Sequence, residues 1–131
     1  MRLLIVQSGV LESRVPPYRL AELEGVAAEL VTAAEATGAA HAEEFDAIVI
    51  LPPLAASAQQ TLCQQLRQAG VTAPVLALLG LSTVQDRVDV LDAGADDCVG
   101  GPVERQEVVA RLFALTRRRR RPGSPSVGRS R

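Results

Sequence analysis

Residues 74–102 read PVLALLGLSTVQDRVDVLDAGADDCVGGP, and the order of apolar and capping residues predicts a strand, a helix and a second strand. The apolar run at 75–79 is typical of a strand buried on both faces of a parallel sheet. Ser82 or Thr83 can cap the helix that follows, and Gly94 can supply the left-handed conformation that ends it. The segment therefore predicts one strand–helix–strand unit of an α/β fold.

Apolar runs of the same kind occur earlier in the chain, at 3–6 and 47–51. Stretches with helical spacing of apolar residues lie at 62–69, 84–91 and 108–115. Because strands and helices alternate, we predict a doubly wound, five-stranded parallel sheet with helices on both faces.

The first helix and the second strand are the least regular predicted elements. Pro16 and Pro17 would break a helix in mid-course, which leaves residues 18–24 as its best-formed part. Residues 29–32 read as a weak second strand. We therefore expect an irregular first helix.

Charge is distributed unevenly along the 131 residues. Residues 1–116 carry seven arginines and all 15 acidic residues, whereas residues 117–131 carry seven arginines and no acid. The Pro- and Ser-rich end of the chain cannot bury a core. We predict one domain over residues 1–118 and a basic, disordered tail or linker over residues 119–131.

Composition also limits the location and the partners of the chain. No apolar run is long enough to span a bilayer, and the N-terminus becomes polar at Gln7 before a signal-peptide core could form, so we expect a cytoplasmic protein. The acidic body has no tryptophan, one tyrosine and two phenylalanines. It lacks the positive face and the stacking platforms that nucleic acid needs.

The residues most often used as metal ligands are few. Cys63 and Cys98 form no CxxC pair and have no ligand cluster nearby, so we interpret both as buried apolar side chains in a reduced compartment. No basic residue adjoins either one to depress its pKa. The single histidine, His41, lies in a polar stretch and is interpreted as a surface residue. We expect neither a metal nor a cofactor.

The segments Gln85-Asp86-Arg87-Val88 and Leu91-Asp92-Ala93-Gly94-Ala95-Asp96-Asp97, with Pro102 after the last strand, carry a family resemblance. They closely resemble receiver domains of bacterial response regulators, and most of all the OmpR/PhoB subfamily. The resemblance covers residues 1 to about 118. It implies the CheY-like, flavodoxin-like form of the predicted fold.

The resemblance also implies a phosphorylation pocket, but the residues that would form it are missing. In the family an acidic cluster binds Mg²⁺, an aspartate accepts the phosphoryl group, and a hydroxyl and a lysine bind its oxygens. The corresponding positions here are Gln7, Ser8 and Gly9 for the acids, Leu51 for the acceptor, Leu79 for the hydroxyl and Gly101 for the lysine. We therefore predict an atypical receiver that neither accepts phosphate nor acts as an enzyme.

Two details extend this prediction. Asp46 lies at the opposite end of the third strand from the acceptor position, about 16 Å away at the rise of a strand, and cannot replace the acceptor. The aromatic residue that couples phosphate to the output face is replaced by Cys98. We expect Leu51 and Leu79 to fill the former pocket, with a small bound ligand as the alternative.

The subfamily forms a two-fold dimer through its fourth helix, fifth strand and fifth helix, and this chain keeps the corresponding positions. They are Arg87, Val88, Leu91, Asp96, Asp97, Glu107, Ala110, Arg111 and Arg118. The resemblance implies ion pairs across the subunits between Arg87 and Glu107, Asp97 and Arg111, and Asp96 and Arg118. Alternatively these are solvated surface charges, because Glu107 and Arg111 are four residues apart and can pair within one helix.

The resemblance implies a regulatory and dimerisation domain, independent of phosphorylation, in a transcription regulator. A winged-helix output domain would follow downstream, and the chain would contact DNA only through it. A small ligand or a protein partner would supply the signal. The alternative is a stand-alone pseudo-receiver that acts as a protein-interaction adaptor. Residues 117–121 read either as a solvated helix end or as a direct phosphate contact.

Overall fold

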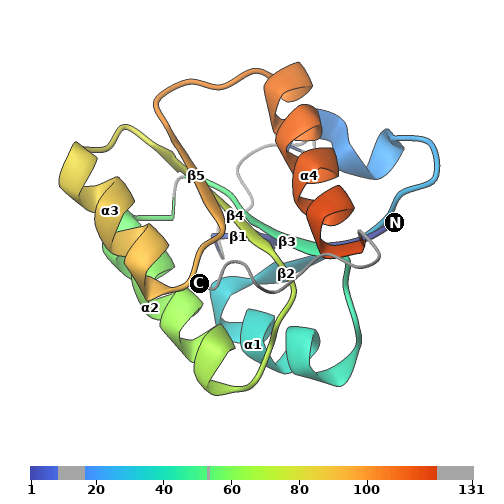
Figure 1. Ribbon diagram of the computed structural model, residues 1–131, viewed down its shortest axis with the longest axis horizontal. Helices are drawn as coiled ribbons and strands as arrows, with labels where there is room; N and C mark the ends of the chain where they lie inside the picture. Colours follow the sequence, from blue (N-terminus) through green and yellow to red (C-terminus); the bar gives the residue numbers. More distant parts are fainter. Residues whose placement is uncertain (9–16, 53, 121–131) are drawn as a thin grey trace.

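The computed structural model describes residues 1–8, 17–52 and 54–120, which form a parallel five-stranded sheet in the order β2-β1-β3-β4-β5 (Figure 1). The strands are β1 (Arg2–Gln7), β2 (Ala27–Thr32), β3 (Ala47–Ile50), β4 (Val75–Gly80) and β5 (Asp97–Gly100). The other elements are the 3₁₀ segment η1 (Pro17–Glu22) and helices α1 (Ala33–Ala42), α2 (Ala56–Gln68), α3 (Val84–Ala93) and α4 (Arg105–Arg120). The predicted fold class is confirmed.

The two faces of the sheet carry separate core layers. Along β1, Leu4 and Val6 pack on the side of α1, α2 and α3, whereas Leu3 and Ile5 pack on the side of η1 and α4. All four side chains are buried, because neighbouring residues of a strand point to opposite faces and both faces are covered by helical elements. Full burial of such a side chain contributes about 1.5–3 kcal/mol, so both layers stabilise the sheet.

The ends of α3 follow the local signals in the sequence. Thr83 is the N-cap: its hydroxyl accepts the N–H of Asp86 at 3.0 Å, and the Asp86 carboxylate accepts the N–H of Thr83 at 2.9 Å. Gly94 ends the helix with a φ of +132°. The predicted helix is confirmed, and Thr83 rather than Ser82 caps it.

The described residues 17–26 before β2 are irregular, as predicted. They contain η1, in which Tyr18 and Arg19 have positive φ angles of 57° and 47°. Pro16 lies outside the described residues. Because η1 takes the place of the expected first helix, the expected fourth and fifth helices are α3 and α4.

Helix α1 was not predicted, because alanines form its buried face and no stripe of large apolar residues marks it. Only Ala36 and Ala40 of this helix are buried. Its local signal is a capping arrangement at its start, where the Glu35 carboxylate accepts the Thr32 N–H at 2.9 Å and the Thr32 hydroxyl at 3.1 Å. These bonds hold the pKa of Glu35 below its ordinary value.

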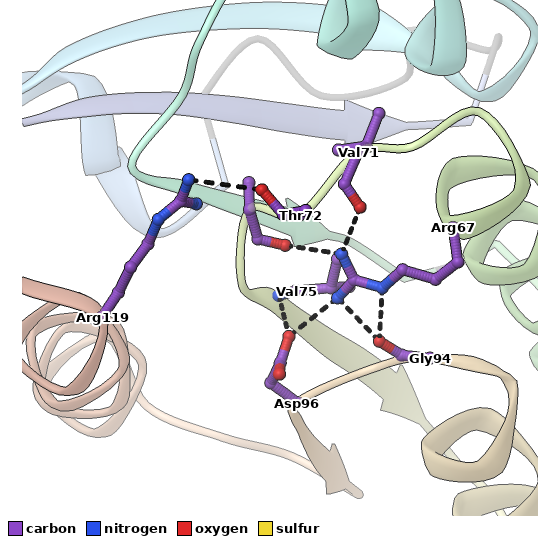
Figure 2. Close-up of polar contacts among 8 residues, drawn as sticks. Arg67, Val71, Thr72, Val75, Gly94, Asp96 and Arg119 are labelled. Carbon is purple, nitrogen blue, oxygen red and sulfur yellow. Dashed lines mark hydrogen bonds and ion pairs between the residues drawn. The ribbon is translucent and has the colours of Figure 1, made fainter. Parts of the chain in front are cut away.

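The Arg67 guanidinium joins the amino ends of β4 and β5 through hydrogen bonds (Figure 2). Arg67, near the end of α2, donates to the carbonyls of Val71, Ala73 and Gly94 at 2.8–3.0 Å. It also binds the Asp96 carboxylate at 2.9 Å. Asp96 in turn accepts the N–H of Val75 at 2.8 Å. We call these contacts the Arg67 network.

The last helix reaches beyond the predicted domain boundary. Because α4 continues to Arg120, a boundary at residue 118 falls within its final turn. Residues 121–131, predicted as tail or linker, lie outside the described residues. In the part of the chain that the structure describes, no helix combines the length and the apolar composition needed to cross a membrane.

Candidate functional site

The carboxyl edge of the sheet, between β1 and β3, is where folds of this strand order bind ligands. The elements that follow β1 and β3 lie on opposite faces of the sheet, which is the arrangement at which such folds bind ligands. Gln7 ends β1, and Gln7 and Ser8 are both half-buried. Gly9 lies outside the described residues. The structure thus places Gln7, Ser8 and Leu51 at this edge.

The two leucines at the former acceptor and hydroxyl positions do not pack together. Leu51 is fully buried in the core layer under η1 and α4, while Leu79 is 5% exposed in the layer under α1, α2 and α3. The expectation that they jointly fill one pocket is therefore wrong. Each leucine completes the core of its own face, because the pleat directs the two side chains to opposite sides.

Glycines line the edge where the family's lysine would lie. Gly101 has a φ of +75°, a conformation that a lysine would adopt only under strain. At Gly100, a Cβ atom would lie 2.5 Å from the Ser82 hydroxyl oxygen and 2.8 Å from Nη1 of Arg87. The Arg87 guanidinium therefore lies against the backbone of β5, and this close approach depends on glycine at position 100.

The described residues show neither a metal-ligand cluster nor an aspartate that could replace the acceptor at this edge. In the described ranges, no three His, Cys, Asp or Glu side chains gather where they could hold a metal ion. Asp46 lies just before β3, at the amino edge, where its carboxylate accepts the backbone N–H of Arg2 at 2.7 Å. The described carboxyl edge thus presents leucine, glycine, glutamine and serine where phosphoryl transfer needs carboxylates and an amine.

The predicted dimer face forms one continuous surface, because β5 lies between α3 and α4 (Figure 1). Its apolar part is on α3, where Val88 and Leu91 are 41% and 42% exposed. Val84 and Leu81 extend the same stripe and are 68% and 101% exposed. The spacing that predicted this helix therefore marks its solvent-facing side, and Val90 is the buried residue of α3.

Several charged residues of this face already have partners within the chain. Arg111 donates to the Asp97 carboxylate at 3.0 Å and to the Glu107 carboxylate at 3.0 Å. Asp96 belongs to the Arg67 network. Arg111 thus fastens α4 to the start of β5. The two hydrogen bonds from Arg87 are long, at 3.3–3.4 Å to Ser82.

Two remaining members of the predicted interface are at the surface of α4. Ala110 and Arg118 are both exposed. Arg118 is in the last helical turn, beyond Leu115 of the core. The predicted interface residues therefore all lie on or beside the surface formed by α3, β5 and α4.

Comparison with known proteins identifies the family. The response regulator protein PmrA of Pseudomonas aeruginosa is 40% identical over 97 residues, which are 73% of this chain and 44% of PmrA. The transcriptional regulatory protein TcrA of Mycobacterium tuberculosis is 37% identical over 92 residues, 70% of this chain and 36% of TcrA. The chain thus spans less than half the length of these relatives. No protein-family model matches the sequence.

Solved structures agree in fold. The signal receiver domain of a histidine kinase from Syntrophus aciditrophicus superposes with a TM-score of 0.72 at 27% identity, covering 94% of this chain and 95% of that one. A two-component response regulator from Clostridium difficile gives 0.74 at 22% identity, covering 92% and 99%. The chain is a response-regulator receiver domain.

The two cysteines of this receiver domain are near arginines, contrary to the expectation from sequence. Arg67 acts on Cys63 and Arg87 on Cys98, and each lowers the pKa of its cysteine. Burial outweighs both effects, raising the pKa of the Cys63 thiol to about 11 and that of Cys98 above its ordinary value. Both thiols are free; Cys63 is buried as predicted, whereas Cys98 is only half-buried, which corrects the prediction for that residue.

Sequence reasoning missed two parts of the receiver surface. Leu81 and Val84 share the helical spacing of Val88 and Leu91, and this spacing was the available signal. No local sequence pattern indicates the Arg67 network, because Arg67 binds Gly94 and Asp96, which lie 27 and 29 residues away in the sequence.

Proposed function

We propose that this receiver domain is a regulatory and dimerisation domain, independent of phosphorylation, of a DNA-binding transcription regulator. A winged-helix output domain would lie downstream, and the receiver would catalyse no reaction. The observation that carries the proposal is Leu51: the residue at the acceptor position is apolar and fully buried. The relatives PmrA and TcrA, which are regulators more than twice as long as the matched region, support the downstream domain.

Phosphorylation independence follows from the chemistry of the side chains. A leucine has no lone pair to attack phosphorus, and neither Gln7 nor Ser8 supplies the negative charge that a bound Mg²⁺ requires. The signal that replaces phosphate would be a small ligand or a protein partner that favours one assembly state.

The test is mass spectrometry after incubation with acetyl phosphate and Mg²⁺, with a receiver domain that carries the usual aspartate as positive control. The mass of this chain should stay unchanged while the control gains one phosphoryl group. An added phosphoryl group mapped to residues 46–54 would overturn the proposal.

Dimerisation rests on the apolar stripe of α3. Val88 and Leu91 expose two-fifths of their surface beside a row of opposite charges. Ion pairs at the rim of an interface contribute about 0–1 kcal/mol each, so the apolar contact supplies most of the affinity and the charges set the orientation. Under two-fold symmetry each pair would occur twice.

A mixing experiment separates contacts across subunits from contacts within a chain. In Arg111→Glu and in Asp97→Arg, like charges face each other and each homodimer should weaken by about tenfold, or about 1.4 kcal/mol. Mixing the two variants places opposite charges across both copies of the pair. A heterodimer should therefore form with near wild-type affinity, as measured by sedimentation equilibrium. If the charges pair only within one chain, mixing will not rescue association, and the proposed orientation is wrong.

The apolar contribution has a matched control. Leu91 is 42% exposed on α3, and Leu30 is 43% exposed on β2, outside the proposed face. Leu91→Gln should abolish the dimer, whereas Leu30→Gln should leave it intact. Equal effects of the two changes would show that the loss does not come from the α3 face.

A stand-alone adaptor is the second candidate, favoured by Leu81 and Val84. Val84 on α3 and Leu81 just before this helix are more exposed than Val88 and Leu91, and they offer an apolar ridge to a different protein. A monomeric wild type at high concentration would favour the adaptor over the dimeric regulator.

A further inference from the structure

The last turn of α4 concentrates positive charge at the amino end of the sheet. Arg117, Arg118 and Arg119 are consecutive and exposed. They open a segment, residues 117–131, that carries seven arginines and no acid. Like charges this close repel one another, so the helix end favours a partner with negative charge.

These three arginines are not neutralised by the surface around them. In the part of the chain that the structure describes, no ion pair joins any of them to a carboxylate. Arg119 donates to the Thr72 hydroxyl at 3.5 Å (Figure 2). The nearby Asp96 carboxylate is occupied by Arg67 and by the N–H of Val75.

A shallow cleft of about 200 Å³ lies between this helix end and the chain before β4. It is lined by Thr72, Pro74, Asp96, Leu115, Arg118 and Arg119. Two guanidinium groups, one hydroxyl and the Asp96 carboxylate thus border a space larger than a phosphate group, and Arg67 already pairs with that carboxylate at 2.9 Å. Guanidinium groups bind phosphate oxygens through paired, charge-assisted hydrogen bonds.

The composition of residues 117–131 selects among polyanions. The segment has no aromatic residue on which the bases of a single strand could stack. Its one large apolar residue, Val127, is too little to enter a bilayer. Arginine without aromatic or apolar companions suits the closely spaced phosphates of a duplex.

We propose that the cleft formed by Thr72, Arg118 and Arg119 binds a backbone phosphate of duplex DNA, without preference for base sequence. This departs from the expectation that the chain contacts DNA only through a downstream domain. It does not depend on dimerisation, since one chain contains the whole cleft. A downstream domain would read the bases, and this contact would add affinity and fix orientation.

The test is fluorescence anisotropy of a labelled duplex of arbitrary sequence with the full 131-residue chain at several salt concentrations. Affinity should fall steeply with salt. Arg119→Gln should weaken binding and reduce the slope of log K against log salt by about 0.9, the value for one phosphate contact. Thr72→Val should weaken binding and leave the slope unchanged, because its hydroxyl is neutral.

The control variant removes one positive charge outside the cleft. Arg19→Gln makes the same change in net charge. Arg19 pairs with Glu22 at 3.4 Å and does not line the cleft. This variant should bind as the wild type does. Arg118 is left unchanged because the proposed dimer also uses it, so dimer failure and failure of the DNA contact remain separate results.

Three results would overturn the proposal. The first is an Arg119→Gln variant that binds like the wild type, and the second is an equal loss in Arg19→Gln. The third is binding to anionic phosphatidylglycerol vesicles or to a single strand that exceeds binding to the duplex, which would assign the arginines to another partner.

Discussion

Replacing Arg67 with methionine removes the guanidinium that joins α2, the end of α3 and the amino ends of β4 and β5, while it keeps most of the aliphatic stem. The wild-type guanidinium makes five hydrogen bonds. Four of these go to the carbonyls of Val71, Ala73 and Gly94, and one goes to the Asp96 carboxylate.

The expected loss can be worked out from these contacts. Each of the three carbonyl acceptors loses a hydrogen bond, which contributes about 1 kcal/mol net to stability. The ion pair with Asp96 adds about 0.5–1 kcal/mol, because the aspartate side chain is 44% exposed and solvent screens the attraction. Some freed carbonyls will bind water, so we expect a total loss of about 2–4 kcal/mol. This is a large fraction of the free energy of unfolding of a typical domain, which is about 5–15 kcal/mol.

Urea denaturation at one fixed protein concentration measures this loss and keeps any dimer contribution constant. Arg67→Lys should recover less than half of it, because one ammonium cannot reach acceptors arranged around a planar fork. Arg19→Gln, which breaks an exposed pair, should change stability by less than about 0.5 kcal/mol. A methionine variant within about 0.5 kcal/mol of the wild type, or a lysine variant as stable as the wild type, would refute the reasoning.

Three further predictions, on a helix cap, on two glycines and on a cysteine, test other parts of the structure. Thr83→Ala should destabilise the domain by about 1 kcal/mol in urea denaturation through loss of the α3 cap, and Thr83→Ser should not. Gly100→Ala should cost less than about 1 kcal/mol, because its Cβ would meet the Ser82 hydroxyl and Nη1 of Arg87, the ends of side chains that can turn away. Gly38→Ala, with no atom within 4 Å, should stabilise α1. Between pH 9 and about pH 11 the free energy of unfolding should fall, since the Cys63 thiol ionises in the unfolded chain first, its folded pKa being raised to about 11. A Cys63→Ala variant that shows the same fall between these pH values would contradict that assignment.

The elements that could be predicted from the sequence are those with strong local signals. The apolar run of β4 identifies a buried strand, and Thr83 and Gly94 mark the ends of α3. Helix α1 escaped prediction because Ala36 and Ala40 bury too little surface to form an apolar stripe. Its capping arrangement was readable, but Thr32 is also the last residue of β2, so strand and cap signals overlap there.

Helix α3 shows that the helical spacing of apolar residues can be correct while the side of the helix that they occupy faces solvent and not the core. Val84, Val88 and Leu91 have helical spacing, yet this side faces solvent, and Val90 packs in the core. Periodicity reports that apolar residues share one side of a helix. It does not tell whether the sheet or another molecule covers that side.

Residue identity alone predicts the loss of the usual phosphoryl chemistry at the matched positions, since Leu51 has no nucleophile and Gly101 no amine in any geometry. Only the tertiary structure decided that Leu51 and Leu79 belong to opposite core layers and that Asp96 is held by Arg67. The chemistry of a side chain is local, and its absence can be read from one position. Burial and pairing depend on residues far apart in sequence, which packing of the sheet and helices brings together.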